Sequence, residues 1–269
     1  MKSFIKYIPI LLLIASLSAC SDDETPFNPT EGLTRIGEAY ALGAGAKVEL
    51  WAKEDLFTGY NNLYVALYDS VDGDRITESH IQFNPLMAMS TGMKHSCPVI
   101  NPEETAVKEL FPGVVVFIMP SSDMGSWKMD VRVHNHHNEK EGTATFDIIV
   151  ANPSVTQVKS FVTGSAEKMF VSYTFAEDKK VGVNDFEVIV YQMVSGMEFA
   201  PIQDYTIQLE PEMPSMGHGS PNNVDPVHDA DGRYMGKVNF TMTGDWRLNL
   251  TLNRADDATQ SLFFDVTLD

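Results

Sequence analysis

The sequence contains one internal repeat, and this repeat limits the possible folds more than any other feature. Several sequence blocks occur twice in the same order, about 120 residues apart. The clearest pair is WKMDVRV from Trp127 and WRLNLTL from Trp246. A copy of about 110 residues is large enough for a small domain. The sequence therefore predicts two similar domains, residues 36–151 and 156–269, separated by the polar break at 151–154.

Apolar and polar residues alternate in both copies, as they do in strands with one buried face. In DYTIQLEPEM, Tyr205, Ile207 and Leu209 fall on one face and the residues between them on the other. Turn signals such as Asp72-Gly73 separate such segments. About seven short strands per copy predict an all-β chain of two tandem immunoglobulin-like antiparallel β-sandwiches. We expect one tryptophan in each core.

The N-terminal segment predicts export and lipidation. Two lysines precede an apolar run from Ile8 to Leu17, and small residues lead to Cys20. This pattern is typical of a secretory signal and is too short for a spanning helix. The stretch LSAC resembles a bacterial lipobox, so residues 1–19 would be a signal peptide and Cys20 the lipidated residue. The alternative is an ordinary signal peptide in which Cys20 has no role. Residues 20–35 then form an acidic, proline-containing linker.

The acidic run Asp22-Asp23-Glu24 follows Cys20 almost directly. It resembles the signal with which some Gram-negative bacteria export lipoproteins to the outer face of the outer membrane. The alternative is a plain solvated linker, with the protein facing the periplasm. We expect an outer membrane lipoprotein at the cell surface, held in the membrane by its lipid anchor.

Charge and motif content exclude several classes of function. The net charge of −18 repels phosphate groups, which argues against nucleic acid as a partner. The sequence has no Gly-x-Ser-x-Gly, HExxH or phosphate-loop motif, so we predict that the protein is not an enzyme. After lipidation of Cys20 only Cys97 remains, and no intramolecular disulfide can form.

The second copy contains a recognisable pattern of glycine, methionine and aromatic residues. Its elements are Pro211, Met213, Pro214, Met216, Gly217, His218, Gly232, Tyr234, Gly236, Val238, Phe240, Met242, Gly244, Trp246 and Leu248. Through them residues 207–252 resemble the YtkA-like domain, a relative of FixH-type domains of extracytoplasmic bacterial proteins. The first copy is a divergent version, with Met93-Lys94-His95 at the corresponding turn. The resemblance implies a β-sandwich with a heavy-metal or respiratory role in the envelope, and it supplies no catalytic activity.

Methionine and histidine occur at matching places in the two copies. Met216 and His218 are two residues apart, so in an extended segment their side chains would face the same way. Thioether and imidazole suit copper(I), whereas calcium and magnesium prefer oxygen ligands. The candidate metal ligands are Met213, Met216, His218 and Met242 in the second copy and Met87, Met93, His95 and Met119 in the first, with Cys97 as a further candidate.

Two functions are open at this point. The first is an envelope lipoprotein that binds or buffers a soft metal, copper(I) above all, or passes it to an envelope protein partner. The second is a non-enzymatic cell-surface interaction module for a protein or glycan, in which methionine only fills gaps in the core. The first predicts that the sulfurs of Met213, Met216 and Met242 converge on the ring of His218.

Overall fold

The computed structural model describes residues 27–255 and 257–269. The predicted signal peptide, Cys20 and the acidic run Asp22-Asp23-Glu24 lie outside the described residues. Within the described part, the helical content is one short 3-10 helix, Leu42–Ala44. No helix in this part is long and apolar enough to cross a bilayer.

Strands make up most of both halves of the chain. The first half contains β1 (Thr34–Ala41), β2 (Ala46–Ala52), β3 (Gly59–Asp69), β4 (Arg75–Ile76), β5 (Ser79–Met89), β6 (Lys94–His95), β7 (Val99–Ile100), β8 (Phe111–Phe117), β9 (Gly125–Asn135) and β10 (Lys140–Ile148). The second half contains β11 (Val158–Val162), β12 (Lys168–Phe175), β13 (Gly182–Ser195), β14 (Glu198–Pro201), β15 (Thr206–Met213), β16 (His218–Gly219), β17 (Val224–His228), β18 (Arg233–Phe240), β19 (Gly244–Asn253) and β20 (Gln260–Leu268). Each copy thus has more strands than the seven expected. The additional strands, such as β6 and β16, are too short to produce an alternating pattern in the sequence.

The two halves share one topology. In the first, one sheet has the order β1-β2-β3-β8-β7 with β4 beside β3, and the other has the order β10-β9-β5-β6. In the second, the orders are β11-β12-β13-β18-β17 with β14 beside β13, and β20-β19-β15-β16. Each strand of the second half thus pairs like the strand ten places earlier. The predicted all-β chain of two antiparallel sandwiches is confirmed, while its immunoglobulin-like character and the domain bounds stay predictions.

Each sandwich packs around the predicted tryptophan. Trp127 and Trp246 are each 1 % exposed. Each indole N–H donates to the backbone oxygen of a methionine in the preceding loop, Met119 at 2.9 Å and Met242 at 3.1 Å. The alternation also holds, because Ile207 and its apolar neighbours on β15 are buried between exposed polar residues. Burial of the tryptophan in both cores is therefore confirmed.

A matching asparagine supports the start of β3 and of β13. The side chain of Asn61 accepts a hydrogen bond from the Phe57 N–H at 3.0 Å and donates to two backbone oxygens, each at 2.8 Å. Asn184 makes the same three bonds, starting with the Lys180 N–H at 2.9 Å. Buried amides satisfied in this way fix the loop that leads into each strand. The repeat in sequence therefore extends to its hydrogen bonds.

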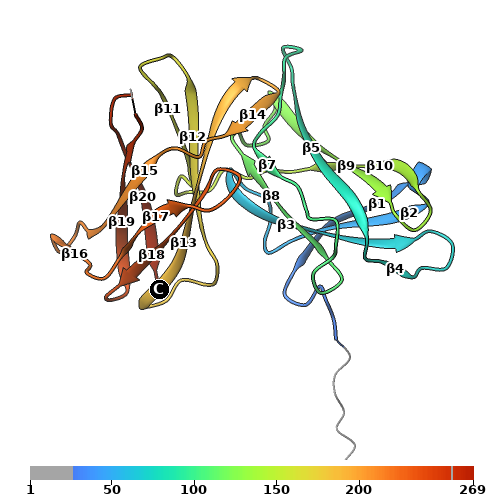
Figure 1. The fold of residues 1–269 in the computed structure, drawn as a ribbon, viewed down its shortest axis with the longest axis horizontal. Coiled ribbons are helices and arrows are strands. Elements are labelled where there is room, and N and C mark those ends of the chain that lie inside the picture. Colours follow the sequence, from blue (N-terminus) through green and yellow to red (C-terminus); the bar gives the residue numbers. More distant parts are fainter. Residues whose placement is uncertain (1–26, 256) are drawn as a thin grey trace, which may run out of the picture.

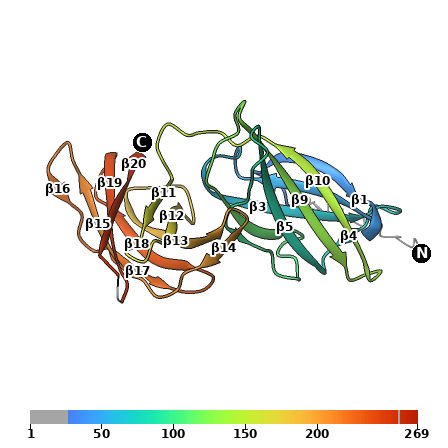
Figure 2. The same ribbon diagram turned by 90° about the horizontal axis from the view of Figure 1, so that it is seen from above.

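The two domains meet through the outer faces of their larger sheets. Tyr60, Val114 and Val116 of the first domain pack against Ile189 and Tyr191 of the second. A backbone hydrogen bond of 2.8 Å from Ser96 N to Gly196 O adds a contact at the β13–β14 turn. Both views place β14 next to the first domain and β16 at the far end of the second (Figures 1 and 2). The two turns that contain a methionine and a histidine, Met93-Lys94-His95 and Met216-Gly217-His218, are called the Met-His turns below. They consequently have different surroundings.

Candidate functional site

Met213 and His218 lie opposite each other at the outer end of the second domain. They are cross-strand partners on β15 and β16, so their side chains share one face of the sheet. Met213 is 2 % exposed and packs in the core. The turn that joins the two strands is closed by hydrogen bonds from Met216 N at 3.1 Å and Gly217 N at 2.9 Å to Met213 O.

His218 is held on one side of its ring and open on the other. Its ring lies edge-on to the indole of Trp246, with the centroids 5.8 Å apart. Its Nδ1 atom is 3.0 Å from the backbone oxygen of Gly219. When Nδ1 carries the proton it donates to this oxygen, and Nε2 then holds the free lone pair that a metal requires.

The two other methionines of the second copy differ in position. Met242 lies between β18 and β19, is 37 % exposed, and contacts Trp246 through its backbone oxygen. Met216 is in the turn itself and is 61 % exposed. The expectation that Met216 and His218 face the same way in an extended segment is wrong, because residues 214–217 form a turn. The structure thus places the His218 ring and the Met242 backbone oxygen beside the indole of Trp246, Met213 in the same core cluster, and Met216 on the surface.

The first copy has the same arrangement beside the domain junction. Met87 is the cross-strand partner of His95, Met119 accepts the hydrogen bond of Trp127, and Met93 is exposed. However, His95 faces the second domain: a Cβ atom added at Gly196 would lie 3.3 Å from its Nδ1. The turn between β13 and β14 therefore lies against this histidine, whereas β16 of the second copy has no such neighbour among the described residues.

Cys97, the further candidate ligand of the first copy, is part of the core. Its side chain is buried, and this burial raises the pKa of the thiol well above its ordinary value. A thiol that resists ionisation is a poor nucleophile and a poor partner for a metal. The structure therefore favours packing as the role of Cys97.

The donor set near Trp246 suits a soft metal. In residues 27–255 and 257–269, no three side chains of His, Cys, Asp or Glu form a group that could hold a metal ion. The soft donor groups on and beside the second Met-His turn are the imidazole of His218 and the thioethers of Met213, Met216 and Met242. This set fits copper(I) and fits calcium or magnesium poorly.

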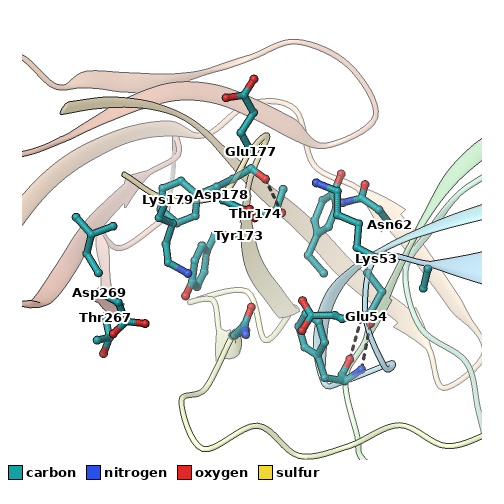
Figure 3. A pocket seen from close by; sticks show the side chains of 17 residues that line it. Lys53, Glu54, Asn62, Tyr173, Thr174, Glu177, Asp178, Lys179, Thr267 and Asp269 are labelled. Atoms are coloured by element: carbon teal, nitrogen blue, oxygen red, sulfur yellow. Dashed lines mark hydrogen bonds between the residues drawn. The ribbon is translucent and has the colours of Figure 1, made fainter. Parts of the chain in front are cut away.

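A cleft that no sequence pattern predicted lies between the two domains. Its volume is about 410 Å³, and residues of both domains line it. Figure 3 shows Lys53, Glu54 and Asn62 of the first domain on one side and Lys179 and Asp269 of the second on the other. These residues are distant in sequence and look like ordinary surface residues there, so only the packing of the domains reveals the cleft.

The second domain has a match among known families. Residues 165–251 match the YtkA-like family. The match covers β12 to β18 and most of β19, and it includes Met213, Met216, His218, Met242 and Trp246. The resemblance expected for residues 207–252 is thereby confirmed. The YtkA-like match covers only residues of the second copy.

Comparisons with whole proteins add distant similarities. A search of curated proteins found no match. The solved structure described as pT26-6p is 8 % identical, with a TM-score of 0.28 over 88 % of this chain and 65 % of that one. The adhesin InvE of Yersinia pseudotuberculosis is 13 % identical, with a TM-score of 0.25 over 89 % of this chain and 59 % of its own. A DUF4785 family protein of Legionella pneumophila is 12 % identical, with a TM-score of 0.27 over 81 % of this chain and 56 % of its own. The chain thus spans less than two thirds of each of these structures.

Proposed function

We propose that this protein is a non-enzymatic lipoprotein of the cell envelope whose YtkA-like domain binds copper(I) through Met213, His218 and Met242. The observation that carries the proposal is the cross-strand Met213–His218 pair, with the His218 ring against Trp246 and its Nδ1 beside the Gly219 oxygen. Lipidation at Cys20 and exposure at the outer membrane surface belong to the same proposal and rest on the N-terminal sequence.

The residues around the turn have separate roles in this proposal. His218 supplies a neutral Nε2 donor, held in place by the contact of Nδ1 with the backbone. Met213 and Met242 supply thioether sulfur, which prefers copper(I) over harder ions. Trp246 holds the loop of Met242 through its indole N–H and lies beside the imidazole. In this proposal Met216, on the exposed turn, adds a further sulfur from the solvent side.

Competition with a chromophoric copper(I) chelator tests the proposal on the purified protein. We expect about one copper(I) per chain, and His218→Ala should weaken the affinity at least tenfold. His95→Ala is the matched control, because His95 occupies the same place in the first copy, beside the domain junction. It should change the affinity less than twofold.

Two results would contradict the proposal. One is that the purified protein leaves all copper(I) with the chelator. The other is that His218→Ala and His95→Ala have equal effects, since the second turn would then have no special role.

A further inference from the structure

The outer face of the larger sheet in the first domain carries aromatic residues beside the domain junction. Trp51 on β2 and Tyr64 on β3 are cross-strand partners, and Pro112 on β8 continues the same row. Trp51 and Tyr64 are half-buried, and Pro112 is exposed. Their neighbours along β2, Leu50 and Ala52, point into the core. The row therefore lies on a rigid sheet with part of its aromatic surface open to solvent.

A carboxylate fixes the indole of Trp51. Trp51 Nε1 donates to Glu49 Oε2 at 3.2 Å, and Lys47 Nζ donates to Glu49 Oε1 at 2.8 Å. Burial alone would raise the pKa of Glu49, but the hydrogen bonds and charge of Lys47, with help from Trp51, hold it below its ordinary value. Glu49 is therefore ionised at neutral pH and keeps the polar edge of the indole occupied, which leaves the ring face as its free surface.

Tyr64 also borders a narrow groove between the domains. This groove of about 130 Å³ is lined by Lys53, Asn62 and Tyr64 of the first domain and by Asp185 and Glu187 of the second, among others. Lys53 and Asn62 line the adjoining larger cleft as well, where Figure 3 shows them side by side. The aromatic row thus leads directly into the junction of the domains.

Glu187 brings an unsatisfied acceptor to this groove. Its buried Oε1 atom has no hydrogen-bond partner among the described residues. Burial raises the pKa of Glu187, and the neighbouring Tyr60 and the charge of Arg233 only partly offset this. Buried polar atoms without a partner are rare, because leaving one unsatisfied lowers the stability of the fold. Oε1 itself has almost no accessible surface, so a ligand that donates a hydrogen bond here would remove this penalty only by displacing a side chain at the edge of the groove.

We infer that the aromatic row and the groove bind a neutral glycan. A sugar ring has an apolar C–H face that stacks on the electron-rich face of Trp51 or Tyr64, and hydroxyls at its edge that can donate to Glu187 Oε1 and bond with Asn62. Both requirements are met side by side at this junction. Asp185 and Glu187 in the groove, together with the net charge of −18, repel anionic polymers.

Affinity electrophoresis of the full-length protein tests this inference without any metal. The gels contain a panel of neutral polysaccharides (a β-glucan, an α-glucan, a mannan and a xylan), an anionic alginate or no polymer. We expect retardation by at least one neutral polymer and none by alginate. Tyr64→Ala and Glu187→Ala should each weaken the retarding affinity at least fivefold. Tyr64→Phe, which keeps the ring, should stay within twofold.

Two controls separate this site from other surfaces. Tyr40→Ala removes an exposed ring from β1 of the same sheet and should leave binding unchanged. His218→Ala should also leave it unchanged, which makes failure of the copper proposal distinguishable from failure of this one. Thermal unfolding of Tyr64→Ala checks that this variant is folded. If it is not folded, the binding of Tyr64→Phe is compared with that of the unmodified protein instead.

Three outcomes would overturn the inference. The first is that no neutral polymer in the panel retards the protein. The second is that Tyr64→Ala and Tyr40→Ala behave alike. The third is that a lysine-rich peptide binds in the groove with loss on Glu187→Ala while all glycans fail, which would assign the junction to a basic protein partner.

Discussion

The two domains share a fold but expose different chemistry on the outer face of the larger sheet. In the first domain, Tyr60 pairs with Val116 at the start of β3, and both are buried against the second domain. The corresponding pair in the second domain is Val183 and Asn239, and Val183 is about half exposed. Both copies therefore use this face at the junction, but at different places: the first through the start of β3 and the second through Ile189 and Tyr191 further along β13, so that Val183 stays exposed.

The Met-His turns of the two copies also differ in what surrounds them. In the first copy the turn between β13 and β14 lies against His95, and in the second copy Met216 and Met242 are partly exposed beside His218. Duplication has thus produced two equivalent turns, of which the first lies at the domain junction and the second at the far end of the second domain (Figures 1 and 2). A shared sequence pattern within one chain does not imply a shared function, because the packing of the domains gives the two copies different neighbours.

The largest expected effect tests whether the two cores are equivalent. Trp127→Ala and Trp246→Ala each remove a fully buried indole and its hydrogen bond to a methionine oxygen. Each should lower the free energy of unfolding of its own domain by about 3–5 kcal/mol. Chemical denaturation followed by circular dichroism measures both. If one variant loses less than about 1 kcal/mol, the tryptophans do not hold equivalent places in their cores.

A smaller effect tests the difference between the two outer faces. Val116→Asp places a carboxylate in the apolar interface between the domains and should cost about 2–3 kcal/mol, because the buried charge has no partner there. Val183→Asp makes the same change at a half-exposed position on the outer face of the second domain and should cost less than about 1 kcal/mol. Limited proteolysis between residues 149 and 157 reports whether the domains separate. Equal costs would mean that the first domain gains nothing from this contact.

Besides its alternating pattern, the sequence contains a signal for the difference between the outer faces of the two domains. The strands and both buried tryptophans follow from period-two alternation. The interface has a local signal too, since Val114, Val115 and Val116 form a continuous apolar run, whereas Lys237, Val238 and Asn239 alternate at the same place. A run that is apolar on both faces indicates a strand covered on both sides. The comparison of the two copies could therefore have located the interface.

Other features could not be predicted from the sequence. The opposition of Met213 and His218 depends on the register of the two-residue strand β16, which the turn at 214–217 sets. The groove at the junction depends on contacts between residues more than a hundred positions apart, such as Tyr64 and Glu187. Local pattern carries no information on such contacts. The metal ligands proposed for both copies stay predictions, with the second turn as the better supported of the two.

The smallest expected effect concerns Glu187, which occupies on β13 the place of Tyr64 on β3. Burial raises the pKa of Glu187 in the folded protein. The folded state therefore holds the proton more tightly than the unfolded chain, and ionisation at neutral pH opposes folding. Glu187→Gln removes this penalty while keeping the shape, so it should raise the free energy of unfolding at pH 7. The gain should vanish below the ordinary pKa of a glutamate side chain, where the carboxyl is protonated in both states.

Denaturant unfolding of Glu187→Gln at pH 7 and pH 4 measures this gain, with Asp185→Asn as the control. Asp185 also lines the groove, but its carboxylate is exposed and paired with Lys237 at 2.7 Å, so its replacement should not stabilise the protein. A gain for Glu187→Gln that is present at pH 7 and absent at pH 4 would show that the chain retains a destabilising acid at the domain junction. Retention of such a group is expected where it serves binding rather than stability. A loss of stability at pH 7 would instead make the carboxylate part of the interface, and the argument that its Oε1 awaits a ligand would fail.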